Sequence, residues 1–409
     1  MLKDKCIKAK QAQAALSSAS GQVRNNALEL MAGALKREAE YILSENERDI
    51  EAARHKGLSE SLIDRLMLTK ERVDGICASL MKVYALPDPL GKGSVWTRPN
   101  GLTIQKVQVP LGLLAIIYES RPNVTCDAAA LCIKSGNAVV LRGGSEAIKS
   151  NIALANVLRG AIEKVGLSAD CIQIVEDTSR ETATELMKMN DYIDLLIPRG
   201  GKSLIQAVVK NSTVPVIATG AGNCHIYIDE SADMKMALNI IENAKTSRPS
   251  VCNAAESLLI NRSIAKTLLP LIKEHLPKVE LRGCSEALAI LPGITAATDE
   301  DFYTEYNDYI LSVKVVGDVR EAVAHINEHN TKHSDAIITQ NTAAAEYFMI
   351  NVDAAAVYVN ASTRFTDGEE FGFGAEIGIS TQKIHARGPM GLDELTTVKY
   401  KVIGNGQIR

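Results

Sequence analysis

The sequence lacks several features that would assign a function directly. None of its eight cysteines forms a C-x-x-C pair, which argues against a dithiol redox motif and a zinc ribbon. The longest apolar segment, Val109–Tyr118, is too short to cross a bilayer and is interrupted by Pro110 and Gly112. Lysine and arginine number 45 against 49 aspartates and glutamates, so a net charge of −4 gives no electrostatic reason to expect nucleic-acid binding.

The common phosphate-binding motifs are missing as well. The dinucleotide fingerprint G-x-G-x-x-G fails at Gly220-Ala-Gly222, which lacks the third glycine, and at Gly372-Phe-Gly374, where Gly378 comes one place too late. The segment Gly201-Lys-Ser203 resembles the end of a P-loop, but the first glycine of that motif would fall at Leu196. A phosphate site must therefore be sought from the position of loops rather than from a consensus.

Length and composition favour a multidomain globular protein. A chain of 409 residues with 46% apolar residues can build two or three domains with sizeable cores. The N-terminal residues 1–7 contain no apolar stretch of the signal-peptide type, and the cysteines are scattered without a disulfide framework. We therefore expect a cytoplasmic protein with no membrane contact.

The first quarter of the chain is predicted to be helical and to end in a hairpin. Apolar residues recur at helical spacing up to about residue 86, with Thr69 as a candidate N-cap. After a break at residues 87–94, residues 95–109 form a polar hairpin whose turn is Arg98–Gly101. A hairpin with so little apolar surface needs support, and we expect another subunit to provide it.

Beyond residue 110 short aliphatic runs alternate with helical patterns. Such runs, buried on both faces and joined by helices, are typical of doubly wound parallel sheets, so the fold class is α/β. One series predicts a first sheet and a later series predicts a second. The first contains 111–118, 138–141, 172–175, 193–197 and 214–218; the second contains 225–228, 257–260, 287–291, 311–316, 336–339 and 356–360.

Three loops that follow strands of the first series carry glycine, and two of these also carry charge. They are Arg142–Glu146, Pro198–Lys202 and Thr219–Gly222. Ligands of doubly wound sheets bind beyond the carboxyl ends of the strands, and basic, glycine-rich loops suit phosphate groups. The alternative is that these loops are only tight turns.

Cys252 is the strongest candidate nucleophile. Arg248 and Pro249 interrupt the preceding helical pattern, and apolar residues resume at Ala254, which predicts that Cys252 lies at a helix N-terminus. The helix dipole and the charge of Arg248 would then favour a thiolate. The alternative is a buried, unreactive cysteine.

Cys126 is the rival nucleophile, because it too follows an Arg-Pro pair and a predicted helix start. The neighbouring Asp127 opposes a thiolate, and Cys132 falls inside an apolar run that reads as core.

Two further patterns have modest interpretations. His325, His329 and His333 recur every four residues, a spacing compatible with metal binding, but their polar neighbours favour a solvated helical face and no metal site. The glycine-rich segment Asp367–Glu376 reads as a flexible loop and a candidate lid.

Several long blocks of the sequence resemble the γ-glutamyl phosphate reductases, a family of the aldehyde dehydrogenase superfamily. The resemblance extends from the first helices to the last residues. Its blocks are Tyr118–Thr125, Leu141–Glu146, Ile197–Gly201, Arg248–Ala254, Val359–Gly368, Glu376–Lys383 and His385–Gly391.

The resemblance implies a fold and a reaction. The expected domains are an NADPH-binding domain of residues 1–222, a β flap for oligomerisation of 93–109 with 386–409, and a catalytic domain of 223–385. The implied reaction is the NADPH-dependent reduction of L-glutamyl 5-phosphate to L-glutamate 5-semialdehyde with release of phosphate, the second step of proline biosynthesis. It proceeds through a cysteine thioester. A homo-oligomer and the partner enzyme glutamate 5-kinase are also implied.

The resemblance also assigns site residues, and these assignments are expectations. Catalysis falls to Cys252 as nucleophile and Asn123 as oxyanion donor. The substrate residues are Ser120, Arg121, Arg248, Ser362 and Thr363, and the cofactor residues are Arg142, Gly143, Gly144, Ser145, Glu146, Arg199, Gly200, Gly201 and Glu305.

One departure from the wider superfamily separates the candidate functions. Where superfamily members carry a Glu-Leu-Gly-Gly stretch whose glutamate activates water, this chain has Thr219–Gly222. The missing carboxylate argues against an ordinary NAD-dependent aldehyde oxidiser, and a well-placed Cys252 argues against a non-catalytic nucleotide-binding regulator.

Overall fold

The computed structural model describes residues 2–409, which fold into two compact units. Unit 1 contains the chain up to residue 218 together with 372–378 and 390–409, and unit 2 contains 219–371 and 379–389. No helix within residues 2–409 combines the length and the apolar character that crossing a membrane requires.

Unit 1 begins with helices, as the periodicity predicts. Thr69 accepts a hydrogen bond from the backbone N–H of Arg72 and so caps the fifth helix, which confirms the expected N-cap. The helices are α1 (Leu2–Ser18), α2 (Gly21–Arg37), α3 (Ala39–His55), α4 (Glu60–Leu66) and α5 (Lys70–Ala85).

The central sheet of unit 1 has four parallel strands in the order β5-β4-β3-β6. The predicted run 214–218 is not a strand of this sheet: only Val216 forms an isolated bridge, to Leu196. Pro215 in its middle has no N–H to donate to a ladder, which explains the failure. The elements are β3 (Leu113–Tyr118), β4 (Ala138–Arg142), β5 (Ile172–Ile174), β6 (Leu195–Arg199), α6 (Asn123–Lys134), α7 (Ile148–Ile162), α8 (Arg180–Leu186) and α9 (Lys202–Asn211).

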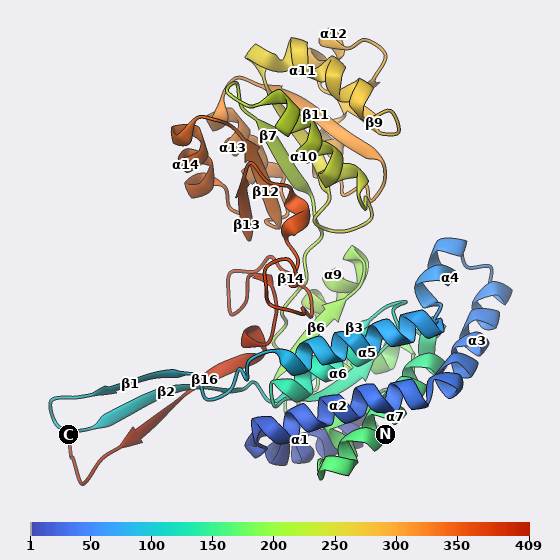
Figure 1. The fold of residues 1–409 in the computed structure, drawn as a ribbon, viewed down its shortest axis with the longest axis vertical. Coiled ribbons are helices and arrows are strands. Elements are labelled where there is room, and N and C mark those ends of the chain that lie inside the picture. Colours follow the sequence, from blue (N-terminus) through green and yellow to red (C-terminus); the bar gives the residue numbers. More distant parts are fainter. Residues whose placement is uncertain (1) are drawn as a thin grey trace. The chain divides into compact units, whose positions relative to one another are not determined.

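A three-stranded antiparallel ribbon, which we call the arm, extends from the rest of unit 1 (Figure 1). It consists of β1 (Gly93–Thr97), β2 (Thr103–Pro110) and β16 (Thr396–Ile403), so the predicted hairpin is confirmed and gains a third strand from the C-terminus. Its exposed side chains include apolar ones at Val95, Trp96, Val398, Tyr400, Val402 and Ile403.

Unit 2 is built on a seven-stranded parallel sheet with the order β10-β9-β11-β8-β7-β12-β13. The predicted strand at 287–291 is wrong, because Ser285–Ile290 forms helix α12, a segment with the helix-forming residues Ala287 and Ala289. The remaining elements are β7 (Cys224–Ile228), α10 (Met234–Thr246), β8 (Ala255–Asn261), α11 (Arg262–His275), β9 (Glu280–Gly283), β10 (Thr295–Ala296), β11 (Ile310–Val316), α13 (Val319–His329), β12 (Ser334–Ile338), α14 (Thr342–Asn351) and β13 (Ala356–Val359), with a small pair β14 (Ile379–Ser380) and β15 (Gly388–Pro389).

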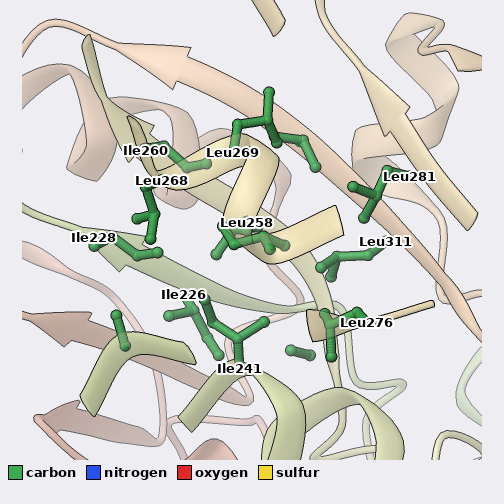
Figure 2. Packing of buried hydrophobic residues seen from close by; sticks show 14 of the residues in the cluster. Ile226, Ile228, Ile241, Leu258, Ile260, Leu268, Leu269, Leu276, Leu281 and Leu311 are labelled. Atoms are coloured by element: carbon green, nitrogen blue, oxygen red, sulfur yellow. The ribbon is translucent and has the colours of Figure 1, made fainter. Parts of the chain in front are cut away.

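The core of unit 2 is aliphatic and lies between the sheet and helices α10 and α11 (Figure 2). Ile226, Leu258 and Leu311 come from neighbouring strands, and Ile241 and Leu268 from the two helices. This packing fixes β8, the strand that directly follows the turn of the candidate nucleophile.

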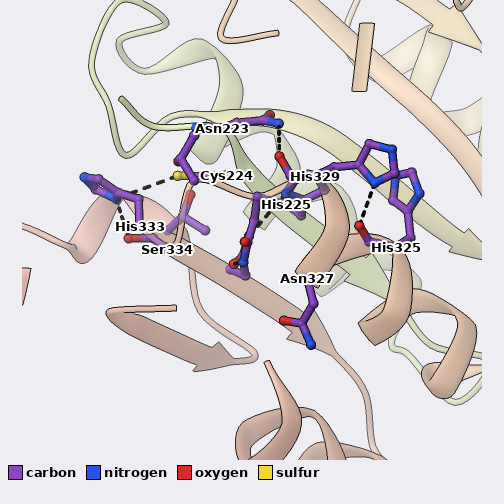
Figure 3. Close-up of polar contacts among 12 residues, drawn as sticks. Asn223, Cys224, His225, His325, Asn327, His329, His333 and Ser334 are labelled. Carbon is purple, nitrogen blue, oxygen red and sulfur yellow. Dashed lines mark hydrogen bonds and ion pairs between the residues drawn. The ribbon is translucent and has the colours of Figure 1, made fainter. Parts of the chain in front are cut away.

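The histidines near α13 do not form a solvated face, so that prediction is wrong. The ring of His325 is buried, stacks on His329 at a centroid distance of 3.9 Å, and meets the edge of Phe302 at 5.1 Å. His333 lies outside the helix, and its Nδ1 is 2.8 Å from the hydroxyl of Ser334 (Figure 3). Within residues 2–409 no three His, Cys, Asp or Glu side chains are grouped to hold a metal ion.

The buried histidines predict acid sensitivity of unit 2. Burial lowers the pKa of His333 to about 4 and also lowers those of His325 and His329, so the unfolded chain binds protons first as the pH falls. Stability should be intact above pH 6.5 and fall below it, by about 1.4 kcal/mol per pH unit for each histidine.

Urea unfolding followed from pH 7.5 to 4.5 measures this slope. His333→Gln should make it shallower, whereas His275→Gln, on the surface of α11, should not. Parallel curves for the wild type and His333→Gln would contradict the prediction.

Candidate active site

Cys252 lies in a turn between α10 and β8. The preceding helix ends at Thr246, as Arg248 and Pro249 predict, and the N–H of Ala254 bonds to the carbonyl of Val251 at 3.0 Å. The helix start predicted at Cys252 is wrong, whereas the strand predicted at 257–260 is confirmed, because residues 255–261 form β8 in the middle of the sheet. A short apolar run buried on both faces cannot be assigned to helix or strand from periodicity alone. A helix dipole therefore does not act on this thiol.

Contacts from several segments fix the backbone of this turn. Gly222 packs flat against it, since a Cβ at Gly222 would come within 1.4 Å of the Cys252 carbonyl oxygen. The thiol of Cys224 lies 3.2 Å from that same oxygen, and the hydroxyl of Thr363 donates to the carbonyl of Asn253 at 2.7 Å. The amide of Asn253 in turn donates to the carbonyl of Thr366 at 3.0 Å.

Two guanidinium groups give the turn a positive environment. Arg364 is half-buried, donates from Nε to the hydroxyl of Ser247 at 3.1 Å, and also donates to the side-chain oxygen of Asn253. Its pKa is lowered by burial and by the nearby exposed Arg248. Two neighbouring cations of this kind favour an anion between or beside them, whether a thiolate or a phosphate.

Glu305 lies near the turn of Cys252, which it reaches through Gly222. Its carboxylate accepts the N–H of Gly222 at 2.7 Å, so the predicted ribose-binding residue lies beside the glycine that supports Cys252. The segment Thr219–Gly222 contains no carboxylate of its own; Thr219 is buried and bridges to Ser380.

The predicted cofactor loops of unit 1 lie together at the carboxyl ends of its strands. Strand β3 pairs in parallel with both β4 and β6, so Ser120, Arg142 and Arg199 follow neighbouring strand ends. The Glu146 carboxylate accepts the N–H of Ser120 at 2.7 Å and its hydroxyl at 2.6 Å. These bonds hold Ser120 at a φ of +40°, which is rare for a residue other than glycine.

Sequence reasoning missed Glu119 in this arrangement. Its carboxylate accepts the N–H of Gly201 at 3.0 Å, and a Cβ at Gly200 would lie 2.4 Å from it. An acidic residue directly after the buried strand β3 was the available signal.

Arg142 lies at the carboxyl end of β4 and is braced by a neighbouring loop. Its Nη2 donates to the carbonyls of Thr178 at 2.5 Å and Ser179 at 3.2 Å, while its buried Nε has no hydrogen-bond partner among residues 2–409. The guanidinium with its unpartnered Nε fits an anionic ligand such as a phosphate of a cofactor.

The first turn of α6 holds the other predicted residues of unit 1. Arg121 and Asn123 are exposed, and the amide of Asn123 donates to Asp127 at 3.0 Å. Cys126 is fully buried, and burial raises the pKa of its thiol well above the usual value. This environment does not suit a nucleophile.

The structure buries Ser362 and Thr363. The Thr363 hydroxyl is used to hold the carbonyl of Asn253, and the Ser362 hydroxyl accepts the N–H of Arg364 at 3.3 Å. In this segment the partly exposed, charged side chain is Arg364.

Comparisons with known proteins agree on a family. The sequence profile of the Aldehyde dehydrogenase family matches residues 2–306. The γ-glutamyl phosphate reductase of Petrotoga mobilis is 57% identical over 408 residues, covering 99% of this chain and 98% of that protein. The γ-glutamyl phosphate reductase of Clostridium perfringens strain SM101 is 58% identical over 405 residues, with 98% of each covered.

The fold comparison gives the same answer. The crystal structure of γ-glutamyl phosphate reductase from Thermotoga maritima superposes with a TM-score of 0.99 at 48% identity, covering 100% of this chain and 99% of that one. These likenesses extend over nearly the whole sequence, and the chain therefore belongs to the aldehyde dehydrogenase family, among its γ-glutamyl phosphate reductases.

Proposed function

We propose that Cys252 is the nucleophile in the reduction of L-glutamyl 5-phosphate to L-glutamate 5-semialdehyde, the second step of proline biosynthesis. The observation that supports this most strongly is the fixed turn of Cys252, with Arg248 and Arg364 beside it. The thiolate attacks the acyl carbon, a C–S bond forms as the C–O bond to phosphate breaks, and phosphate leaves to give a thioester. Cys252 is released as a thiolate when the aldehyde departs.

The charges near Cys252 suit the leaving group. Arg248 and Arg364 can neutralise the phosphate as it departs, and an oxyanion on the acyl carbon needs N–H donors such as backbone amides or the amide of Asn123. Ser120 and Arg121 remain candidates for the amino-acid end of the substrate. We assign Ser362 and Thr363 to support of this segment, because both are buried and engaged with its backbone.

The family binds a nicotinamide cofactor, and we propose NADPH. The cofactor, when bound, supplies the hydride. Residues 142–146 and 199–201 would hold its phosphates and adenosine ribose, and Glu305 its nicotinamide ribose. The positive charge of Arg142 favours the additional 2′-phosphate of NADPH.

We further propose that the arm mediates homo-oligomerisation. Its strands expose Val95, Trp96, Tyr400 and Val402 on a ribbon too thin to bury them by itself. A second copy of the chain is the simplest cover for such a surface. Glutamate 5-kinase, which makes the labile acyl phosphate, is the expected enzyme partner.

Replacing Cys252 by serine should reduce turnover to background, because a serine hydroxyl provides no comparable anion at neutral pH. The fold and equilibrium binding of NADPH should be preserved. Cys126→Ser is the matched control and should keep most of the activity, since that thiol is buried in α6. Steady-state rates and fluorescence titration with NADPH measure both effects, and the reverse pattern would exclude Cys252 as nucleophile.

Replacing Arg142 by alanine should raise the KM for NADPH more than that for NADH, by about tenfold more, because only NADPH carries the 2′-phosphate. Arg159→Ala is the control: that guanidinium also braces a backbone carbonyl, that of Ile172 at the start of β5, and should not discriminate between the cofactors. Equal losses for both cofactors would mean that Arg142 supports its loop and does not bind the 2′-phosphate.

In the oxidative direction, steady NADPH production from glutamate semialdehyde and NADP⁺ should depend on added phosphate. Residues 219–222 offer no base to activate water, whereas phosphate is itself a nucleophile at neutral pH. Stopped-flow and steady-state absorbance should show only a burst or a slow leak without phosphate. Full turnover in phosphate-free buffer would indicate an ordinary aldehyde oxidiser, and Glu305, the carboxylate held by Gly222, would become the candidate base.

A further inference from the structure

Lys245 and Glu256 form an ion pair in the interior of unit 2. The Lys245 ammonium, in the last turn of α10, lies 2.5 Å from Oε2 of Glu256, in β8, and both side chains are completely shielded from solvent. Replacing such a pair with apolar residues of similar volume often leaves stability unchanged or improves it, so stability alone does not account for the pair.

The second carboxylate oxygen of Glu256 makes a contact that accounts for the pair. Its Oε1 accepts the N–H of Asn307 at 3.1 Å. Asn307 has a φ of +57°, in the left-handed region, and follows Glu305 by two residues. Lys245 therefore fixes the carboxylate from α10, and the carboxylate fixes the loop that carries Glu305.

The far end of this chain of contacts is the support of the nucleophile. Glu305 accepts the N–H of Gly222 at 2.7 Å, and Gly222 lies against the backbone of Cys252, four residues before Glu256. The contacts thus close a ring from β8 through residues 305–307 and Gly222 back to the turn that precedes β8.

We propose that Lys245 and Glu256 are positioning residues, which set the place of Glu305 through the Asn307 N–H. Both side chains are shielded from solvent, so we assign them no contact with substrate or cofactor. This inference rests on the proposed contact of Glu305 with the nicotinamide ribose. Because the pair has no net charge, it can hold the loop without adding a charge beside the thiolate of Cys252.

Two double variants separate the hydrogen bond from the charges. Lys245→Met with Glu256→Gln removes both charges but keeps an oxygen acceptor for Asn307. Lys245→Met with Glu256→Leu removes the acceptor as well, at similar volume. We expect the glutamine variant to bind NADPH like the wild type and the leucine variant about tenfold more weakly, the effect of one lost hydrogen bond.

Three measurements on the full chain test the proposal: NADPH affinity by fluorescence titration, the rate of Cys252 alkylation by iodoacetamide, and the melting temperature. NADPH affinity should differ between the two variants and the alkylation rate should not, while the melting temperature of the leucine variant should fall only by the few degrees that one lost hydrogen bond explains. A general loosening of unit 2 would also change the alkylation rate. Lys245→Met with Glu256→Met, which also lacks the acceptor, replaces the leucine variant if that does not fold. Arg262→Met with Glu286→Gln, a solvated pair of the same unit, should change none.

Glu305→Leu, which removes the oxygen acceptor, provides the reference that separates this inference from the proposed function. If Glu305→Leu binds NADPH like the wild type, the proposed role of Glu305 is wrong. If it weakens binding but the Glu256→Leu variant does not, or if the glutamine and leucine variants of Glu256 lose affinity equally, the positioning role of the pair is wrong.

Discussion

The close approach of Gly222 to Cys252 is the constraint on which the arrangement around the proposed nucleophile depends. No side chain fits at Gly222, because a Cβ would overlap the carbonyl of Cys252. The same glycine donates its N–H to Glu305. Gly222 therefore allows the close approach of the Cys252 turn and also fixes the carboxylate of Glu305, which is 83 positions away in the sequence. These contacts hold the backbone of the turn, and the charges nearby are those of Arg248 and Arg364.

Those cations are arranged so that their mutual repulsion favours an anionic ligand. Arg364 is held by Ser247 and Asn253, so it cannot move away from Arg248 without breaking hydrogen bonds. Burial and the neighbouring charge both destabilise its protonated form, which is why its pKa is lowered. Binding of a phosphate would relieve this repulsion, and a thiolate would relieve part of it in the free enzyme. Two arginines thus supply the positive environment that the sequence analysis expected in part from a helix dipole.

The elements that sequence patterns predicted correctly are those that a local pattern of residues marks in the sequence. Both parallel sheets follow from short runs of aliphatic residues, and the hairpin of the arm follows from its turn at Arg98–Gly101. The failures occur where tertiary packing decides. The apolar residues after Cys252 suit a helix as well as the strand predicted at 257–260, and pairing between β7 and β11 makes them a strand; His325 is covered by Phe302 from another segment. The family resemblance, rather than any local pattern, drew attention to Glu305.

Long-range polar contacts are the part of the candidate site that the sequence could not predict. In the sequence, Glu256 is one polar residue near the start of an apolar run, and Lys245 is one charged residue in a helical pattern. Their burial against each other depends on how α10 packs on β8, a geometry with no signature in either segment. Burial raises the pKa of Glu256 and lowers that of Lys245, and the charge of each partner opposes the shift of the other. Because stability alone does not account for such a pair, the contact of Glu256 with the Asn307 N–H points to its task, which is to hold the loop of Glu305.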